Sequence, residues 1–256
     1  MNYSFDLSGR TALVTGASSG LGANFARALA ASGATVVVAA RRVGRLAALV
    51  DDITAAGGKA HAVAMDVADE ASIRAGFAAA EAAAGPINIF VANAGVAGEN
   101  AALDQPTSEV DALLSVNLRG VVLSVQEAAR RMVAAGSADK GDGRIIIIGS
   151  ITAEKIFPGA AVYGATKAAV RHLGRSLARD WARKGINVNV IQPGYFVSEM
   201  TEKMIASPLG EKLVASFPRR RLREMSDLNA PLLWLASDAS AGITGTVITV
   251  DDGQSL

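Results

Sequence analysis

The sequence predicts an α/β fold built on a doubly wound, parallel sheet of seven strands. Short β-rich runs alternate with longer helical patterns almost from end to end. The strand-like runs are apolar on both faces, which is typical of parallel strands covered by helices on both sides. Because crossovers between parallel strands are right-handed, a doubly wound topology is favoured. No long linker divides the chain, so we expect one domain over residues 1–256.

The expected elements follow one another in a regular order. Strands are expected at residues 10–15, 34–39, 60–65, 87–92, 144–149, 186–191 and 246–251. Helices are expected from after Gly22 to about residue 32 and at 43–56, 69–84, 107–135 and 160–184. The helical pattern of 107–135 is interrupted near residues 117–120, and the polar residues 136–143 predict a surface loop.

A long segment after the sixth strand departs from this alternation. Residues 195–225 mix three methionines with Phe196 and Phe217. The segment follows the carboxyl end of a strand, where open α/β sheets bind their ligands. A connection of this length is uncommon unless it covers a site. We therefore expect a helical substrate lid, with a surface helical excursion as the alternative.

The composition excludes several classes of protein. The 25 basic and 24 acidic residues leave a net charge of +1, unlike the basic surface of a nucleic-acid-binding protein. With no cysteine and two histidines, Cys-ligated and three-histidine metal sites are excluded, and we expect no metal. No apolar run approaches the ~18 residues of a membrane helix, and the first residues lack a signal-peptide pattern. We expect a cytoplasmic protein that binds neither nucleic acid nor membrane.

A glycine-rich turn joins the first expected strand to the first helix. It reads Thr-Gly-Ala-Ser-Ser-Gly-Leu-Gly over residues 15–22. Its glycines permit a sharp turn, and the helix N-terminus offers amide hydrogens and partial positive charge to a pyrophosphate. The turn therefore predicts a Rossmann-like dinucleotide site, although tight turns also use glycine for steric reasons. The expected contacts are Gly16, Ser18, Ser19, Gly20, Leu21 and Gly22.

The end of the second strand indicates which dinucleotide binds. An NAD site places a carboxylate there, about 20 residues after the glycines, to hold the ribose hydroxyl. This chain has Ala40 instead, followed by Arg41 and Arg42, whose guanidinium groups suit the 2′-phosphate of NADP. The sequence therefore favours NADP(H), unless both arginines are ordinary surface residues. Further cofactor contacts are expected at the ends of the third and fourth strands, from Asp66, Val67, Asn93, Ala94 and Gly95.

A tyrosine and a lysine four residues apart begin the long helix after the fifth strand. Tyr163 and Lys167 share one helix face. The pair alone is a weak signal, but Ser150 stands at the carboxyl end of the preceding strand, where a bound nicotinamide would arrive. These three residues predict a catalytic site.

At this point the chain resembles the short-chain dehydrogenase/reductase family over nearly its full length. The resemblance rests on the T-G-x-x-x-G-x-G turn, the N-A-G motif at Asn93, Asn117 in its helix, Ser150, the Y-x-x-x-K pair, and Pro193-Gly194 followed by Ser198. It implies that Pro193, Gly194, Phe196 and Ser198 also meet the cofactor. The chain departs from the family pattern at Ala92, where a second asparagine is usual, and at Asp252, where glycine is usual.

The residue types define the chemistry that is expected. Tyr163 would donate a proton to a ketone oxygen while the cofactor supplies a hydride. We expect the ammonium of Lys167 to lower the pKa of Tyr163 and to hold the ribose hydroxyls. Ser150 would fix the substrate oxygen, and Asn117 would hold a water that links Lys167 to solvent.

The leading expectation is an NADP(H)-dependent carbonyl reductase or alcohol dehydrogenase for small to medium, largely apolar substrates. Weaker candidates for its pocket are Val96, Thr152, Phe157, Tyr195 and Phe196. A 3-oxoacyl-[acyl-carrier-protein] reductase of the same family is the alternative, and a non-catalytic dinucleotide sensor is a remote one. The basic run Arg219, Arg220, Arg221 and Arg223 is either solvated or a docking site for an acidic carrier or a phosphorylated substrate. The resemblance also implies a homotetramer.

Overall fold

The computed structural model describes residues 5–98, 100–197 and 201–256. Seven parallel strands lie side by side in the order β3-β2-β1-β4-β5-β6-β7, which is the doubly wound sheet that the sequence predicts. The strands are β1 (Thr11–Thr15), β2 (Thr35–Ala40), β3 (Lys59–Ala64), β4 (Ile89–Ala92), β5 (Gly143–Ile148), β6 (Ile186–Pro193) and β7 (Val247–Val250).

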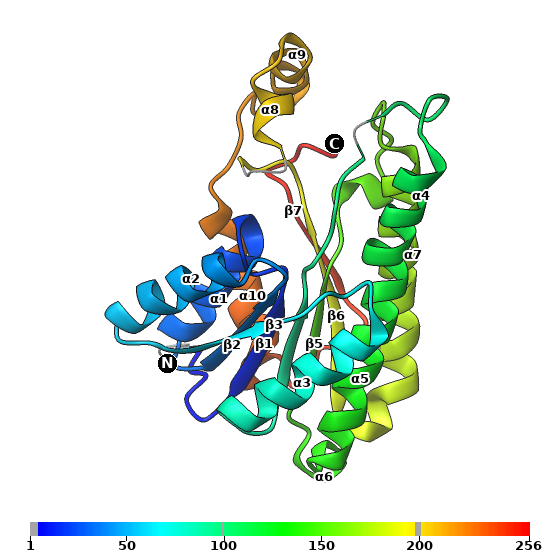
Figure 1. Cartoon of the computed structure of the whole chain (residues 1–256). Helices are drawn as coiled ribbons and strands as arrows, with labels where there is room; N and C mark the ends of the chain where they lie inside the picture. Colours follow the sequence, from blue (N-terminus) through cyan, green and yellow to red (C-terminus); the bar gives the residue numbers. More distant parts are fainter. Residues whose placement is uncertain (1–4, 99, 198–200) are drawn as a thin grey trace.

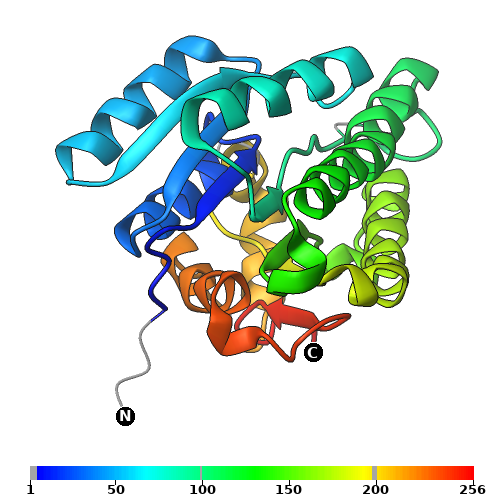
Figure 2. The ribbon, with the colours of Figure 1, turned by 90° about the horizontal axis from the view of Figure 1, so that it is seen from below.

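Helices cover both faces of this sheet. On one face pack α1 (Gly20–Ala31), α2 (Val43–Ala55) and α10 (Asn229–Ala236); on the other pack α3 (Glu70–Ala84), α5 (Val121–Ala134) and α7 (Ala161–Trp181). Figure 1 shows the sheet between the two layers, and Figure 2 shows the same layers from below. Among the described residues, no helix has the length and apolarity that crossing a membrane requires.

The two layers follow from the alternation of side chains along each strand. In β5, Ile146 and Ile148 belong to the core on the α1 face, whereas Ile145 and Ile147 belong to the core on the α7 face. Both faces are buried, so the central strands must be apolar at nearly every position. This explains why the central strands could be recognised as continuous apolar runs.

The structure differs from the predicted elements in two segments. The expected loop at 136–143 contains a short helix, α6 (Ser137–Lys140), so that prediction is wrong for these four residues. The hydroxyl of Ser137 donates to the carbonyl of Lys184 at 2.7 Å and fixes the turn. The expected helix at 107–135 is divided into α4 (Thr107–Leu114), a π-helical segment η1 (Ser115–Gly120) and α5, so its interruption is a widened turn.

The segment predicted as a lid leaves the body of the molecule beyond the carboxyl ends of the strands. It contains α8 (Glu202–Ile205) and α9 (Pro208–Ser216), which lie at the top of Figure 1. The chain then returns through a 3-10 turn, η4 (Met225–Leu228), to α10. A β-bridge between Phe196 and Arg223 joins the two ends of the excursion.

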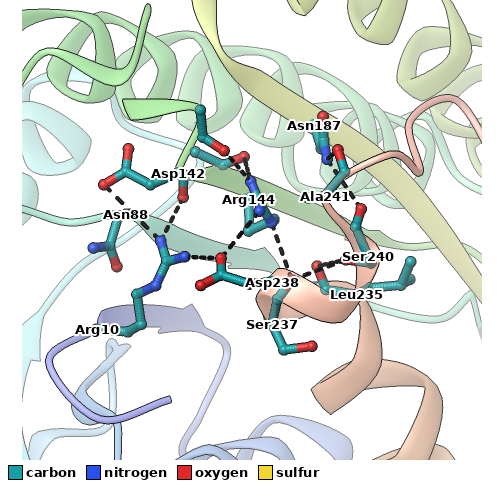
Figure 3. A network of polar contacts seen from close by, with 12 residues as sticks. Arg10, Asn88, Asp142, Arg144, Asn187, Leu235, Ser237, Asp238, Ser240 and Ala241 are labelled. Carbon is teal, nitrogen blue, oxygen red and sulfur yellow. Dashed lines mark hydrogen bonds and ion pairs between the residues drawn. The ribbon is translucent and has the colours of Figure 1, made fainter. Parts of the chain in front are cut away.

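A polar network ties together the opposite, amino-terminal edge of the sheet (Figure 3). The buried side chain of Arg144, at the start of β5, donates to the carbonyls of Gly141 at 2.8 Å and Gly143 at 3.0 Å. Arg144 and Arg10 both pair with Asp238, in the short 3-10 turn η5 (Asp238–Ser240) after α10. Arg10, Arg144 and Asp238 therefore stabilise the fold at this edge, whereas the predicted site residues lie at the carboxyl edge of the sheet.

Candidate active site

The glycine-rich turn after β1 forms a cradle at the start of α1. Gly16 and Gly20 have left-handed backbone conformations, with φ of 66° and 53°. At Gly22 a Cβ atom would lie 2.4 Å from the carbonyl oxygen of Gly16, so only glycine fits there. Within the described residues, the Ser19 side chain does not cap α1, which leaves the helix N-terminus to meet an anion. The turn therefore fits a dinucleotide pyrophosphate, while Leu21 packs against the core behind it.

Asn93 holds this turn in shape from the end of β4. Its side-chain amide donates to the carbonyl of Thr15 at 2.8 Å and to that of Gly16 at 3.3 Å. The hydroxyl of Thr15 in turn accepts from the backbone amides of Asn93 and Ala94. The N-A-G motif was expected to line the floor of the cofactor site, and the structure gives Asn93 the additional role of fixing the glycine turn.

The two arginines after β2 have different partners. Arg42 donates to the hydroxyl of Ser18 at 3.0 Å and to that of Ser19 at 2.7 Å, so its guanidinium lies against the glycine turn. Arg41 is 69% exposed and pairs with Asp66 at 3.8 Å. Sequence reasoning ranked Arg41 first for the 2′-phosphate, but the geometry brings Arg42 closer to the turn.

A groove of about 510 Å³ opens beside Ser18 and Ser19. Its walls come from α1 and α2 and include Arg45, which sequence reasoning missed. Arg45 lies in the first turn of α2, three residues after Arg42, so this spacing could have drawn attention to it. Val67, expected as a cofactor contact, is mostly buried in the core on the α7 face.

Ser150 and Tyr163 meet at the carboxyl edge of the sheet. Ser150 begins a 3-10 turn, η2 (Ile151–Ala153), and its hydroxyl accepts from the backbone amide of Thr152 at 3.2 Å and from its hydroxyl at 3.0 Å. Its hydroxyl also lies close enough to the phenol of Tyr163 to lower the pKa of that group. Gly164 permits this approach, because a Cβ there would lie 2.9 Å from the carbonyl oxygen of Thr152. Thr152 therefore orients the hydroxyl of Ser150 toward Tyr163.

Lys167 lies beneath this pair, one turn further along α7. Its ammonium donates to the carbonyl of Ile148, the last residue of β5, at 3.0 Å, and lies 5.6 Å from the centroid of the Tyr163 ring. The side chain is 5% exposed, and burial lowers the pKa of Lys167 to about 8. At neutral pH the group is still mainly protonated and can hold a hydroxyl or a negative charge.

The expected lowering of the Tyr163 pKa is wrong for the protein alone. Burial raises the pKa of Tyr163 to about 12, and the hydrogen bond with Ser150 offsets only part of this effect. The nearby Tyr195 raises it slightly further. Sequence spacing identified the cation at Lys167, but the cost of removing a phenolate from water decides the direction of the pKa shift of Tyr163. Tyr163 is therefore a neutral phenol at pH 7, and it remains partly accessible to a substrate.

Asn117 is fully buried in η1 and fixes the segment after β4. Its side chain accepts from the amide of Val96 at 2.8 Å and donates to the carbonyl of the same residue at 2.8 Å. A Cβ added to Gly95 would lie 3.3 Å from the Asn117 oxygen and 3.7 Å from the Lys167 ammonium, so these groups share one small space. The side chain of Asn117 is thus held by the backbone of Val96, and its expected contact with a water stays a prediction.

Three aromatic rings pack against one another beside Tyr163, which Tyr195 approaches, and we call Phe157, Tyr195 and Phe217 the aromatic wall. The centroids of Phe157 and Tyr195 are 5.2 Å apart with the rings edge to face, and those of Tyr195 and Phe217 are 6.0 Å apart and stacked. Phe196, predicted as a cofactor and pocket residue, is 4% exposed and packs in the core on the α1 face.

The remaining expected contacts lie at or after the end of β6. Pro193 ends this strand, and Gly194 packs so closely on the chain terminus that a Cβ would lie 2.5 Å from the side-chain oxygen of Gln254. Ser198 lies outside the described residues.

Within the described part of the chain, no group of three His, Asp or Glu side chains could hold a metal ion.

Comparisons with known proteins identify the family of the chain. Residues 10–208 match the family model described as short chain dehydrogenase. The chain is 37% identical to gluconate 5-dehydrogenase of Gluconobacter oxydans over 250 residues, which cover 97% of this chain and 96% of that protein. It is 35% identical to 3-oxoacyl-[acyl-carrier-protein] reductase of Staphylococcus aureus over 246 residues, covering 96% and 98% of the two chains.

The fold of the chain is also similar to that of a solved structure. The crystal structure of a gluconate 5-dehydrogenase from Burkholderia cenocepacia, in complex with NADP and tartrate, matches 98% of this chain and 96% of its own. The TM-score is 0.91 at 36% sequence identity. The chain therefore belongs to the short chain dehydrogenase family, whose members are oxidoreductases that bind a nicotinamide dinucleotide and act on CH–OH groups.

Proposed function

We propose that the protein is an NADP(H)-dependent carbonyl reductase or alcohol dehydrogenase in which Tyr163 is the proton donor and acceptor. The observation that carries the proposal is the contact of three groups at one point. The hydroxyl of Ser150 is near enough to the phenol of Tyr163 to lower its pKa, and the ammonium of Lys167 lies 5.6 Å from the centroid of the same ring. A protein that only sensed the dinucleotide would have no need of a proton donor held in this way.

Ketone reduction follows from the protonation states of these groups. When bound, the reduced nicotinamide supplies the hydride. Ser150 donates a hydrogen bond that holds the ketone oxygen next to the phenol. Tyr163, neutral at pH 7, transfers its proton to that oxygen as negative charge develops there. Lys167 stabilises the resulting phenolate by its positive charge until the proton is replaced.

The preference for NADP(H) rests on the cations beside the glycine turn. Arg42 is bound to Ser18 and Ser19, and Arg41 precedes it directly after the end of β2. The residue at the ribose position is Ala40, which brings no negative charge to repel a 2′-phosphate. The complex of a related gluconate 5-dehydrogenase with NADP supports the same preference.

The aromatic wall favours small to medium, largely apolar substrates. Phe157 and Tyr195 present rings at the site, and aromatic surface is poorly matched to a molecule with a hydroxyl on every carbon. Against this, relatives named for gluconate make a polyhydroxy acid a second candidate. A carrier-bound 3-oxoacyl substrate is a third, supported by the relative from Staphylococcus aureus. The basic run favours it less, because Arg219 and Arg221 are paired with Asp252 and Arg223 with Asp227.

A substrate panel with both cofactors tests the proposal. Aryl and cyclic ketones, acetoacetyl thioesters and 5-ketogluconate are each reduced with NADPH and with NADH, and kcat/KM is compared. We expect the largest value for an apolar ketone with NADPH. A larger value for 5-ketogluconate would assign the enzyme to sugar acids, and one for the thioester would assign it to acyl chains.

We also propose a homotetramer assembled through the segments 107–135 and 160–184 and the C-terminal strand, as the family resemblance implies. Leu114 and Val133, on the first of these segments, are exposed apolar side chains that an interface would cover. Sedimentation equilibrium tests this assembly, and a monomer would contradict it.

A further inference from the structure

Asp252 adopts a backbone conformation that favours glycine. Its φ is 53°, and among the described residues Arg220 is the only other non-glycine residue with a positive φ. Aspartate tolerates this region better than most residues, but holding it there still requires compensation. The ion pairs of its side chain, which is only 14% exposed, compensate for the unfavourable backbone conformation.

The Asp252 carboxylate binds two arginines from the lid segment. One oxygen accepts from Nε of Arg221 at 2.9 Å, and the other pairs with Nε of Arg219 at 3.2 Å. These arginines lower the pKa of Asp252, with the hydrogen bond from Arg221 as the largest cause. One carboxylate therefore joins the end of the lid to the C-terminal tail, which we define as residues 251–256.

The tail is itself fixed to the walls of the site. The side chain of Gln254 accepts from the amide of Tyr195 at 2.7 Å and donates to its carbonyl at 3.1 Å. Lys155, which follows η2, donates to the carbonyls of Gln254 at 2.8 Å and Leu256 at 3.1 Å. These hydrogen bonds connect the tail both to the segment after Ser150 and to the segment after β6.

The lid end held by Asp252 carries one ring of the aromatic wall. Phe217 is 3% exposed, stacks on Tyr195, and precedes Arg219 by two residues. We propose that Asp252 is a positioning residue: through Arg219 and Arg221 it holds Phe217 on Tyr195 and so completes the substrate side of the site. The substrate part of this inference rests on the proposed function, whereas the position of the lid does not.

Amide hydrogen exchange of α9 tests the position of the lid without any substrate. The variants are Asp252→Asn, which keeps the shape of the side chain, and Asp252→Gly, which suits the backbone and so retains the fold. The matched control is Glu70→Gln, which removes the exposed ion pair with Arg74 on α3. We expect residues 209–217 to exchange about tenfold faster in both Asp252 variants and unchanged in the control. Unchanged exchange in the Asp252 variants would overturn the proposal.

Kinetics with the best ketone of the panel test the effect on the substrate. We expect KM to rise about tenfold in Asp252→Asn, with kcat and the Kd of NADPH within about twofold of the wild type. Raising NaCl from about 50 mM to about 500 mM should raise the wild-type KM and leave that of the variant unchanged, because the ion pairs are already absent. A wild-type KM in Asp252→Asn, together with faster exchange of α9, would show that the lid position is irrelevant to this substrate and would overturn the positioning role. If no ketone is turned over by the wild type, the proposed function fails, and the exchange experiment still decides the lid contact.

Discussion

The ammonium of Lys167 lies 5.6 Å from the centroid of the Tyr163 ring, one turn further along α7. The surroundings oppose charge on both groups, so burial raises the pKa of Tyr163 to about 12 and lowers that of Lys167 to about 8. At neutral pH the site contains a protonated acid beside a cation ready to stabilise its conjugate base. This arrangement suits proton donation and costs folding stability.

Replacing Lys167 by methionine tests that cost. The pKa of Lys167 in the folded protein is below its ordinary value of 10.5, so folding opposes the charged form. The stability of the wild type should therefore rise relative to Lys167→Met as the pH rises from about 8 to about 10.5, by on the order of 3 kcal/mol. Urea unfolding at several pH values measures this, with the exposed-site variant Lys59→Met as control. A difference independent of pH would contradict the assignment.

The two directions of the reaction should respond differently to pH. Alcohol oxidation needs Tyr163 as a phenolate, and its raised pKa keeps that form scarce at pH 7. The kcat for oxidation should rise up to about tenfold per pH unit between about pH 7 and 9, whereas the kcat for ketone reduction should not rise. Initial rates in both directions in one set of buffers check this. An oxidation rate that is flat over this range would show that a different group accepts the proton.

The arginines after β2 should distinguish the two cofactors. Removing the guanidinium that meets the 2′-phosphate loses charge-assisted hydrogen bonds, so Arg42→Gln and Arg41→Asp should weaken NADPH binding by about tenfold to a hundredfold. NADH binding should change by about twofold or less. Titration of nicotinamide fluorescence gives both Kd values, with Arg74→Gln on α3 as control. Equal weakening of both cofactors would exclude the 2′-phosphate role.

Asn117 should be important for both stability and turnover. Asn117→Ala leaves the amide and carbonyl of Val96 without their side-chain partner, which should cost about 2–4 kcal/mol of unfolding free energy and lower kcat. The matched control is Ser124→Ala, because the buried hydroxyl of Ser124 has no hydrogen-bond partner among the described residues. Thermal unfolding and kcat below the transition are measured for both. If the two variants behave alike, the hydrogen bonds to Val96 do not support the site.

The positions of the central strands and the shared helix face of Tyr163 and Lys167 could be predicted because each is encoded locally. Central strands that are buried on both faces are continuous apolar runs in the sequence. Tyr163 and Lys167 are four residues apart, so they lie on the same face of their helix. The contact between Ser150 and Tyr163 needed one further assumption, that a strand end and the next helix start meet at the same edge of the sheet.

The partners of individual side chains could not be predicted, because they depend on contacts between distant segments. Nothing local to Asn117 indicates that its amide is occupied by Val96, 21 residues earlier. The same holds for Arg221, whose carboxylate partner Asp252 lies 31 residues later. The direction of the Tyr163 pKa shift also escaped prediction, since sequence spacing reports a nearby charge but not the extent of burial.

The most direct test of the central claim is the rate of ketone reduction by Tyr163→Phe, measured at saturating NADPH with the best ketone of the panel. The substitution removes one hydroxyl and leaves the ring beside Lys167, so the fold and the Kd of NADPH should be retained. We expect the kcat of Tyr163→Phe to fall by about a hundredfold or more. A kcat within about twofold of the wild type, with NADPH still bound, would show that Tyr163 does not supply the proton.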